Sequence, residues 1–189
     1  MFPTDVFKRY RVRDGKEFRL ADFNPADTGG LQVGKEEAKA QLAEGVERMA
    51  KLQDKLYAEH QWALLIILQG MDTSGKDGVV EHVMSGVNPL GCVAHSFKAP
   101  TEHELDHDYL WRCHVALPRR GHIGIFNRSY YEEVLVVRVH PEVLAKEGIP
   151  PRLVGEGIWK QRFKDMVAFE DYLSRIGIVP VKFFLNVSK

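Results

Sequence analysis

A glycine-rich segment that ends in a lysine has the composition of a phosphate-binding loop. Residues 70–78 read GMDTSGKDG and fit the pattern GxxxxGK. Glycines at this spacing let backbone N–H groups gather around a phosphate, and the start of a following helix adds the positive end of its dipole. The lysine supplies a charge for the phosphate oxygens. The segment predicts phosphate contacts from Gly70, Thr73, Ser74, Gly75, Lys76 and Gly78.

Two carboxylates occur within the same loop, at Asp72 and Asp77. Asp77 occupies the position at which such loops usually carry the Ser or Thr whose hydroxyl reaches Mg²⁺. Two acids beside a phosphate would repel it unless cations lay between them, and carboxylate oxygens are good Mg²⁺ ligands. We therefore expect Mg²⁺ as the cofactor, held directly or through water by Asp72 and Asp77.

Further polar residues follow two other apolar runs. Lys98 comes directly after residues 91–97, and Asn127 and Arg128 come after residues 122–126. If both runs are strands of one parallel sheet, these residues meet the glycine-rich loop at the edge where such sheets bind ligands. We expect Arg128 to contact phosphate. Lys98 is a further candidate for a phosphate contact, with a solvated surface lysine as the alternative. Asn127 is neutral where loops of this kind are usually accompanied by a metal-binding Asp, which shifts that role to the carboxylates of the loop.

Two glutamates follow at the start of the next expected helix. Ser129 and Glu132 have the spacing of a capping box, so Glu132 has a structural explanation. Glu133 has no such explanation. It is a candidate, with Asp72, for the carboxylate that positions or deprotonates an attacking phosphate.

A second motif suggests different chemistry. Residues 103–107 read HELDH and match HExxH, the pattern of zinc-dependent proteases. Thr101 and Glu104 also form a capping-box pattern, which gives Glu104 a structural role. His114 or His122 could complete a zinc site, so zinc chemistry stays open as an alternative. Histidines exposed to solvent on a helix are the favoured interpretation.

The elements that must position these residues alternate between apolar runs and amphipathic segments. Such alternation predicts an α/β fold, a parallel sheet with helices on both faces. Residues 140–156 contain several Pro and Gly and predict a surface connection. The expected helices are residues 35–59, 101–117, a segment from 129, and 158–176; the expected strands are 62–68, 91–97, 122–126 and 178–186.

Length and composition limit the class of protein. The chain has 189 residues, of which 44% are hydrophobic and 28% charged, which suits one soluble domain. Lys and Arg together number 26, and Asp and Glu together also number 26, so the formal net charge is zero. The net charge therefore gives no argument for a nucleic-acid partner. No apolar run approaches the roughly 20 residues of a membrane span, and two cysteines fit a reducing cytoplasm. We expect no membrane and no nucleic acid as partners.

Charge is nevertheless unevenly distributed along the chain. Residues 8–19 hold six Lys or Arg and two Asp or Glu. We divide the chain into a basic N-terminal arm, residues 1–33, and a single phosphate-loop core domain, residues 34–189. The arm either wraps over the domain or faces a polyanion, and the sequence favours neither.

Four motifs occurring in order resemble one family. Residues 70–78, 97–101 (FKAPT), 107–112 (HDYLWR) and 126–129 (FNRS) are similar to those of the family-2 polyphosphate kinases. The resemblance implies a thymidylate-kinase-like P-loop fold and Mg²⁺-dependent phosphoryl transfer between inorganic polyphosphate and nucleotides. It also implies roles for Asp72 and Lys76 at the phosphates, for Asp77 and Arg128 in catalysis, and assembly into homodimers or homotetramers.

Two departures from the family pattern refine the expectation. Many members carry Asp and Asn where this chain has Asn127 and Glu132, and the versions seen here resemble the subgroup that phosphorylates both nucleoside mono- and diphosphates. Members also continue past residues 181–186 into a basic helical lid, whereas this sequence stops at Lys189.

The resulting hypothesis is a polyphosphate-dependent nucleotide kinase that converts AMP and ADP, or GMP and GDP, reversibly. We expect polyphosphate to lie between residues 8–19 and a second basic cluster. The purine nucleotide is expected near Arg112, Asn127, Arg128 and Glu132, beside Glu133. Tyr109, Trp111 and Tyr130 could stack on a base or belong to the core. The second basic cluster comprises Arg152, Lys160, Arg162 and Lys164.

Two alternatives remain on the sequence alone. One is an ATP-dependent nucleoside monophosphate kinase on the same fold. The other is a non-catalytic protein that binds polyphosphate or nucleotide.

Overall fold

Four parallel strands form one sheet in the computed structural model, which describes residues 4–30 and 33–187. Their spatial order is β2-β3-β1-β4. All four expected strands and the predicted parallel sheet are confirmed. The strands are β1 (Ala63–Gly70), β2 (Cys92–Ser96), β3 (Ile123–Asn127) and β4 (Ile178–Leu185).

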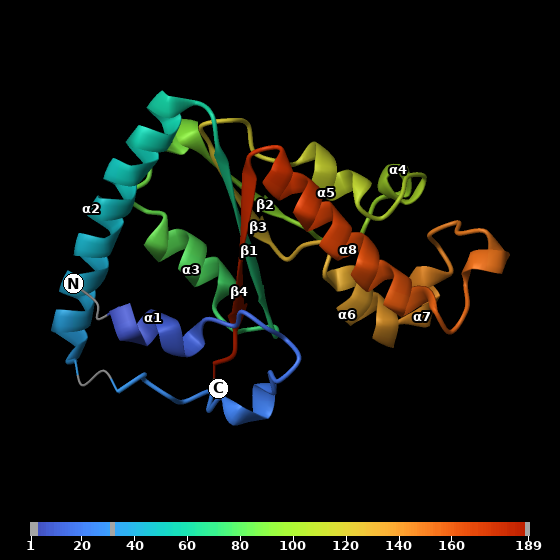
Figure 1. The fold of residues 1–189 in the computed structure, drawn as a ribbon, viewed down its shortest axis with the longest axis horizontal. Coiled ribbons are helices and arrows are strands. Elements are labelled where there is room, and N and C mark those ends of the chain that lie inside the picture. Colours follow the sequence, from blue (N-terminus) through green and yellow to red (C-terminus); the bar gives the residue numbers. More distant parts are fainter. Residues whose placement is uncertain (1–3, 31–32, 188–189) are drawn as a thin grey trace.

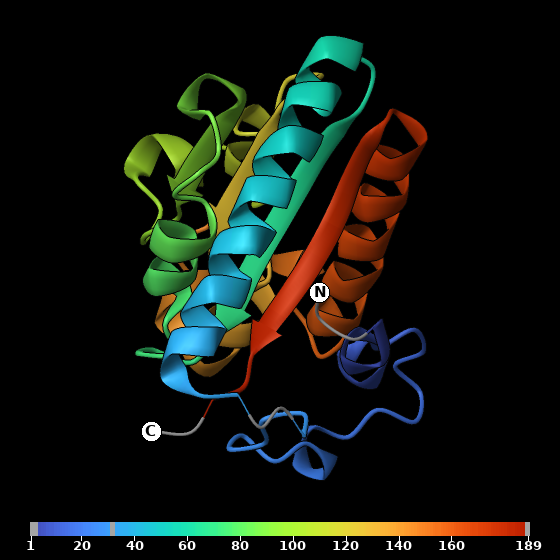
Figure 2. The same ribbon diagram turned by 90° about the vertical axis from the view of Figure 1, so that its left-hand side faces the viewer.

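Helices cover both faces of this sheet (Figure 1). One face carries α2 (Lys35–Glu59) and α3 (Lys76–Val83), and the opposite face carries α8 (Ile158–Arg175) (Figures 1 and 2). Two shorter helices, α5 (Trp111–Val115) and α6 (Glu132–Val139), contribute residues to the same core as α8. The arrangement is the predicted α/β architecture.

The apolar run of β1 reflects its position between two cores. Leu65 and Ile67 are fully buried in the cluster that includes Met166 of α8, whereas Leu68 belongs to the cluster that contacts Met49 of α2. Successive side chains of a strand point to opposite faces, so a strand covered on both sides must be apolar at nearly every position. The same alternation places Ile125 and its neighbour Phe126 of β3 in different clusters.

The long helix α2 begins and ends where its residue pattern predicts. It stops at His60, which adopts a left-handed conformation with φ 53°. Its buried polar residue, Gln53, donates to the Asn88 carbonyl at 2.8 Å and accepts from the Asn88 N–H at 2.8 Å. This pair fixes the helix to the turn that precedes β2.

The prediction of a single helix over residues 101–117 is wrong, because the structure contains two helices in this segment. Helix α4 (Glu102–Leu105) ends early and α5 follows it after an irregular segment. The capping box of Thr101 and Glu104 is present, at 2.7 and 3.3 Å. The Asp108 carboxylate accepts from the Leu110 N–H at 2.9 Å, a local bond that competes with continuation of the helix.

Two smaller expectations also require correction. The connection at residues 140–156 contains the short helix α7 (Pro141–Leu144) and a 3-10 turn, η3 (Pro151–Leu153). The expected Ser129–Glu132 capping box does not form. The Ser129 hydroxyl accepts instead from the Tyr131 N–H at 3.2 Å, and α6 begins at Glu132 without a side-chain cap.

The basic arm lies beside the end of the sheet at which β4 stops (Figures 1 and 2). It contains α1 (Thr4–Tyr10) and a 3-10 turn, η1 (Leu20–Asp22). Arg9 and Tyr10 both bind the Asp27 carboxylate, at 2.7 and 3.0 Å, and Asn186 donates to the Phe23 carbonyl at 3.3 Å. Residues 1–3 and 31–32 of the expected arm and the terminal residues 188–189 lie outside the described part of the chain.

Within residues 4–30 and 33–187, none of the helices is long and apolar enough to cross a membrane.

Candidate functional site

The glycine-rich loop connects the buried end of β1 to the first turn of α3. Lys76 begins α3, and its side chain, only 8% exposed, folds back over the loop. Its ammonium donates to the carbonyls of Gly70 and Met71, both at 2.9 Å, and lies 3.4 Å from the Ser74 hydroxyl. The ammonium is therefore held in place by the oxygen atoms of the loop itself.

Gly70 is required by a close approach of the backbone. A Cβ at this position would lie 2.5 Å from the Ser74 hydroxyl and 2.9 Å from the carbonyl oxygen of Leu185. The second of these atoms belongs to the main chain of β4 and cannot move aside easily. Gly75, which precedes α3, has φ 83°, the left-handed region that glycine adopts without strain.

A cavity of about 430 Å³ opens over this loop. This volume is in the range of small-molecule sites. Of the residues proposed from the sequence, the cavity brings together most of the loop with the polar residues after β2 and β3. Its lining comprises Asp72, Thr73, Ser74, Gly75, Lys76, Asp77, Ser96, Phe97, Lys98, Ala99, Asn127 and Arg128. Gly70, Gly78, Arg112, Glu132 and Glu133 do not line it.

Charged and polar pairs connect the loop to the residues after β3. The Arg128 guanidinium lies 2.8 Å from the Asp72 carboxylate, and both side chains are accessible to solvent. The Asn127 amide donates to the Asp77 carboxylate. Cations and acids from two different strand ends therefore face the same space, which is the arrangement that an anionic, metal-bound ligand requires.

The backbone of the site is strained at two residues. Thr73 has φ 68° and Arg128 has φ 64°, although neither is a glycine. Side chains rarely adopt this left-handed region, and each such residue costs on the order of 1 kcal/mol or more. Both strained residues line the cavity.

The donor groups in the cavity suit Mg²⁺. Asp72 and Asp77 provide carboxylate oxygens beside the Lys76 ammonium, and Asn127 provides an amide oxygen. The described residues contain no group of three or more His, Cys, Asp or Glu side chains that could hold a metal ion by themselves. Mg²⁺ in phosphoryl-transfer sites is commonly held by one or two carboxylates together with substrate phosphates and water, so this sparse set fits it.

Glu132 does not line the cavity and is bound by Gln69, a residue that the sequence analysis did not single out. The amide of Gln69, at the end of β1, donates to the Glu132 carboxylate at 3.1 Å, and its oxygen accepts from the N–H and hydroxyl of Ser129 at 3.1 and 3.0 Å. Gln69 is buried. A glutamine within an otherwise apolar strand was the available signal, because a buried polar side chain needs partners.

Glu133 and Arg112 form a buried ion pair, with side chains 6% and 8% exposed. Arg162, expected at a basic surface, is buried as well. It contacts the Glu133 carboxylate at 3.4 Å and the Glu147 carboxylate. Its guanidinium also stacks over the Tyr109 ring at 4.7 Å. Arg162 is therefore not available as part of a wall for polyphosphate, and that expectation is wrong.

Burial raises the pKa of Glu133 to about 7, and the neighbouring Glu147 adds to this effect. The two arginines oppose the rise but do not cancel it. Burial likewise raises the pKa of Glu132, against the opposing charge of Arg128.

The aromatic residues proposed for base stacking belong to the packing of the domain. Tyr130 is fully buried in the core, and its hydroxyl donates to Glu170 of α8 at 2.9 Å. Burial raises its pKa. Trp111 stacks on the His107 ring at 4.0 Å. None of the three aromatic residues lines the large cavity.

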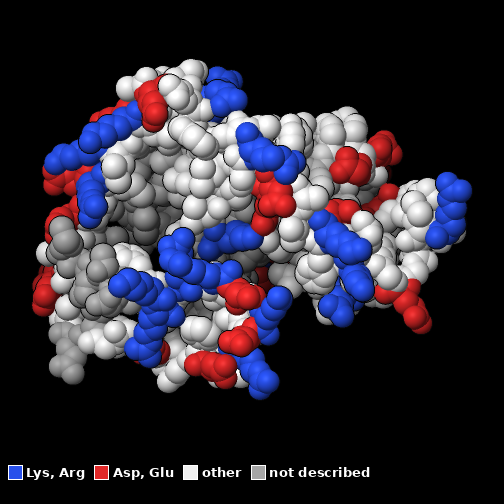
Figure 3. Space-filling view, in the orientation of Figure 1, with Lys and Arg blue, Asp and Glu red and all other residues white. Residues whose placement is uncertain are grey.

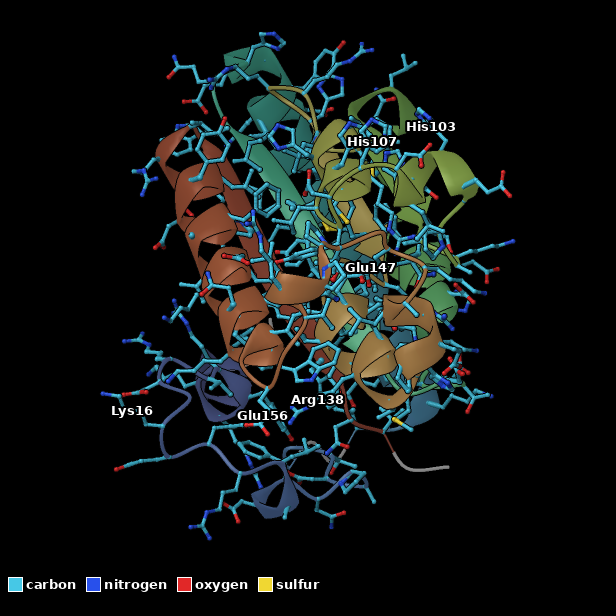
Figure 4. The ribbon with its side chains drawn as sticks, turned by 90° about the vertical axis from the view of Figure 1, so that its right-hand side faces the viewer. Lys16, His103, His107, Arg138, Glu147 and Glu156 are labelled. Carbon is cyan, nitrogen blue, oxygen red and sulfur yellow. The ribbon has the colours of Figure 1, made fainter. Side chains whose placement is uncertain are left out.

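The histidine motif does not assemble as a metal site. Helix α4 ends before His107, so the two histidines do not share one regular helix. The His103 and His107 rings lie 4.9 Å apart, and both contact Trp111 (Figure 4). Among the residues that the structure describes, no third histidine, cysteine or acid joins them to form a metal-binding group.

Part of the arm carries cations that form no salt bridge with another described residue. Figure 3 shows Lys and Arg side chains gathered on the lower half of one face, where Figure 1 places the arm. Arg11, Arg13, Lys16 and Arg19 are exposed, and none forms a salt bridge with another described residue.

Comparison with known proteins identifies the family. A model of the family described as Polyphosphate kinase 2 (PPK2) matches residues 32–189. The chain belongs to the polyphosphate kinase 2 family. It is 46% identical over 183 residues to the ADP-polyphosphate phosphotransferase of Rhodopseudomonas palustris and 45% identical over 182 residues to the AMP/ADP-polyphosphate phosphotransferase of Meiothermus ruber.

A solved structure confirms the fold of this polyphosphate kinase 2 family member. The crystal structure of polyphosphate kinase 2 from Arthrobacter aurescens TC1 matches it with a TM-score of 0.85 at 38% identity, covering 97% of this chain and 62% of that one. The predicted P-loop kinase fold is therefore confirmed. The two curated relatives are matched over 96% of this chain and 63% and 64% of their own lengths, so this chain spans less than two thirds of each.

Proposed function

We propose that this chain carries the phosphate-handling site of an enzyme that transfers phosphoryl groups between inorganic polyphosphate and purine nucleotides, with Mg²⁺ as cofactor. The observation that carries this proposal is the convergence of Lys76, Arg128 and two loop carboxylates on one cavity. Relatives named as AMP- and ADP-polyphosphate phosphotransferases support the choice of substrates. The Asn127 and Glu132 versions of the motif favour acceptance of both mono- and diphosphates of adenosine or guanosine.

The side chains of the cavity divide the work between charge neutralisation and positioning. Lys76, already fixed by the loop carbonyls, offers its charge to the phosphate that the loop surrounds. Arg128 and Lys98 face the same space from two other strand ends and bind the oxygens of the second phosphate group. Phosphoryl transfer needs little covalent chemistry from the protein, because most of its catalysis is positioning and stabilisation of charge.

The carboxylates Asp72 and Asp77 would hold Mg²⁺ on the loop side of the cavity. When bound, Mg²⁺ would neutralise charge on the transferred phosphoryl group. Asp72 is paired with Arg128 at 2.8 Å, so the two residues also orient each other. Asn127 orients Asp77 by donating a hydrogen bond to its carboxylate. Five further candidates do not line the cavity. Gly70 and Gly78 contribute by allowing the backbone shape of the loop. Arg112, Glu132 and Glu133 contribute through contacts with neighbouring residues and not with the ligand.

The arm provides a path for the rest of the polyphosphate chain. Its cations Arg11, Arg13, Lys16 and Arg19 form no salt bridge with another residue among 4–30 and 33–187. The arm itself lies beside the end of the sheet at which β4 stops. A chain of phosphates with one charge per unit is the polyanion that such cations would attract.

Two further properties follow from the same hypothesis. The two free cysteines, Cys92 and Cys113, suit a reducing cytoplasm.

The exposed apolar side chains Leu42, Leu52 and Tyr57 on α2 support a homo-oligomer, either a dimer or a tetramer. Light scattering of the purified chain would test this oligomeric state.

The test is conversion of AMP or ADP by the full chain with long-chain polyphosphate and Mg²⁺, with products quantified by chromatography. Lys76→Met is expected to lower the rate at least about 100-fold, which corresponds to about 2.7 kcal/mol of lost stabilisation. Lys55→Met is the matched control, because Lys55 is exposed on α2 and does not line the cavity.

Three outcomes would contradict the proposal. Full activity of Lys76→Met would exclude the loop as the phosphate site. Turnover with ATP but not with polyphosphate as donor would favour the ATP-dependent kinase. Tight binding of polyphosphate or ADP in calorimetry without any turnover would favour a non-catalytic binding protein.

A further inference from the structure

Arg112 connects the two walls of the cavity from behind. Its guanidinium donates to the Lys98 carbonyl at 2.8 Å through one nitrogen and to the Glu133 carboxylate at 3.3 Å through the other. Lys98 belongs to the segment that follows β2 and lines the cavity. Glu133 belongs to α6, the helix that follows Arg128 on the other wall. One buried side chain therefore bridges both segments.

At the Lys98 end of this bridge, Arg112 supplies the hydrogen bond that a neighbouring strand would otherwise supply. The last ladder bond of β2 with β3 runs from the Phe97 N–H to the Asn127 carbonyl at 3.1 Å. Beyond it the chain leaves the sheet, and the Lys98 carbonyl is bound by Arg112 in place of a neighbouring strand. The guanidinium also lies over the Phe97 ring, 5.5 Å from its centroid. The position of Lys98 thus depends on Arg112.

The Glu133 end of the bridge is held rigidly. Arg162 of α8 donates to the Glu133 main-chain carbonyl at 2.9 Å and lies 3.4 Å from its carboxylate. Glu147, which follows α7, binds the other side of the Arg162 guanidinium. Figure 4 shows Glu147 in the middle of the molecule, between the helices of this side. Contacts from α6, α8 and the segment after α7 therefore anchor Glu133.

We propose that Arg112 is a positioning residue that fixes the distance between Lys98 and Arg128 across the cavity, anchored by Glu133. This inference rests on the proposed function only in requiring that the cavity binds phosphates. Arg112 is 8% exposed and does not line the cavity, so it acts through Lys98 rather than on a ligand. Two phosphate-binding cations on separate loops need such a brace, because a displacement of about 1 Å can cost a factor of about 100 in rate.

Arginine is required at this position by geometry. The two acceptors, a carbonyl on one wall and a carboxylate on the other, are bound by different nitrogens of one planar group. A lysine has a single ammonium on a flexible stem and cannot hold both acceptors at a fixed angle or stack on Phe97. Arg112→Lys therefore keeps the buried charge and removes the brace.

The test is a double-mutant cycle on the full chain with Arg112→Lys and Lys98→Met. Binding of tripolyphosphate with Mg²⁺ is measured by calorimetry, and kcat and KM are measured where turnover occurs. Each single variant is expected to weaken binding about 10-fold and to lower kcat more than it raises KM. The double variant is expected to be within about 2-fold of Lys98→Met, because Arg112 acts through Lys98. Arg138→Lys, an exposed arginine of α6, is the matched control (Figure 4).

The proposal is overturned if the two effects multiply, or if Arg112→Lys binds tripolyphosphate within about 2-fold of the unmodified chain. Should Arg112→Lys lose the fold in circular dichroism, Glu133→Gln replaces it in the cycle. This change leaves Arg112 in place and weakens its contact with residue 133, while Arg162 keeps its 2.9 Å bond to the main-chain carbonyl of that residue. Wild-type binding without turnover would refute the proposed function while leaving the binding cycle as a valid test of the brace.

Discussion

Glu133→Gln should remove a pH dependence of stability that comes from a single buried carboxyl. Burial and the charge of Glu147 raise the pKa of Glu133 from 4.5 to about 7, against the opposing effect of Arg112 and Arg162. The difference corresponds to about 3 kcal/mol, because one pH unit is worth about 1.4 kcal/mol. Since the pKa is raised on folding, the stabilising contribution is complete below pH 4.5 and is lost as the pH rises through 7.

The experiment compares the free energies of unfolding in urea of the wild type and of Glu133→Gln from about pH 5 to about pH 8. Gln resembles the protonated acid, so the variant should be close to the wild type at about pH 5. It should gain about 2 to 3 kcal/mol relative to the wild type by about pH 8. Exposed Glu81→Gln on α3 provides the baseline for removing a carboxylate. A difference between wild type and Glu133→Gln that stays constant with pH, or that changes in the opposite direction, would refute this reasoning.

Two further perturbations test the packing around the site. Gln53→Ala leaves the N–H and carbonyl of Asn88 without their 2.8 Å partners, and urea unfolding should report a loss of about 2 kcal/mol; a loss below about 0.5 kcal/mol would contradict this. Gly70→Ala places a methyl group 2.9 Å from the Leu185 carbonyl and should lower both the melting temperature and polyphosphate affinity. Gly78→Ala, where a Cβ meets nothing within 4 Å, should instead stabilise α3 by up to about 1 kcal/mol, and similar losses for both alanines would be contrary to expectation.

The parts of the fold that the sequence predicted are those set by local pattern. β1 is apolar at consecutive positions because both of its faces are covered, and the glycine spacing after it specifies the loop within a few residues. Helix α2 follows from its regular apolar stripe. The helix expected over residues 101–117 failed because the Asp108 side chain binds the nearby backbone, and hydrophobic periodicity does not register such a bond.

The sequence predicted the position of those site residues that directly follow a strand. Lys98 and Arg128 follow strands of one parallel sheet, so topology alone brings them to the phosphate loop. The sequence did not reveal the burial of Arg112 and Arg162, since that burial depends on acids that are distant in sequence. Charged residues are seldom buried unless paired, and a pattern of residue types along one chain does not reveal the pairing.

The strained backbone at Thr73 and Arg128 means that stability and the proposed phosphate binding favour different residues at the same positions. Glycine would relieve φ 68° and φ 64° and stabilise the fold by on the order of 1 kcal/mol at each site. It would also delete the side chains that line the cavity. Stability-based selection of variants of this chain would therefore enrich glycine at these two positions and produce stable proteins without the side chains that we propose to bind phosphate.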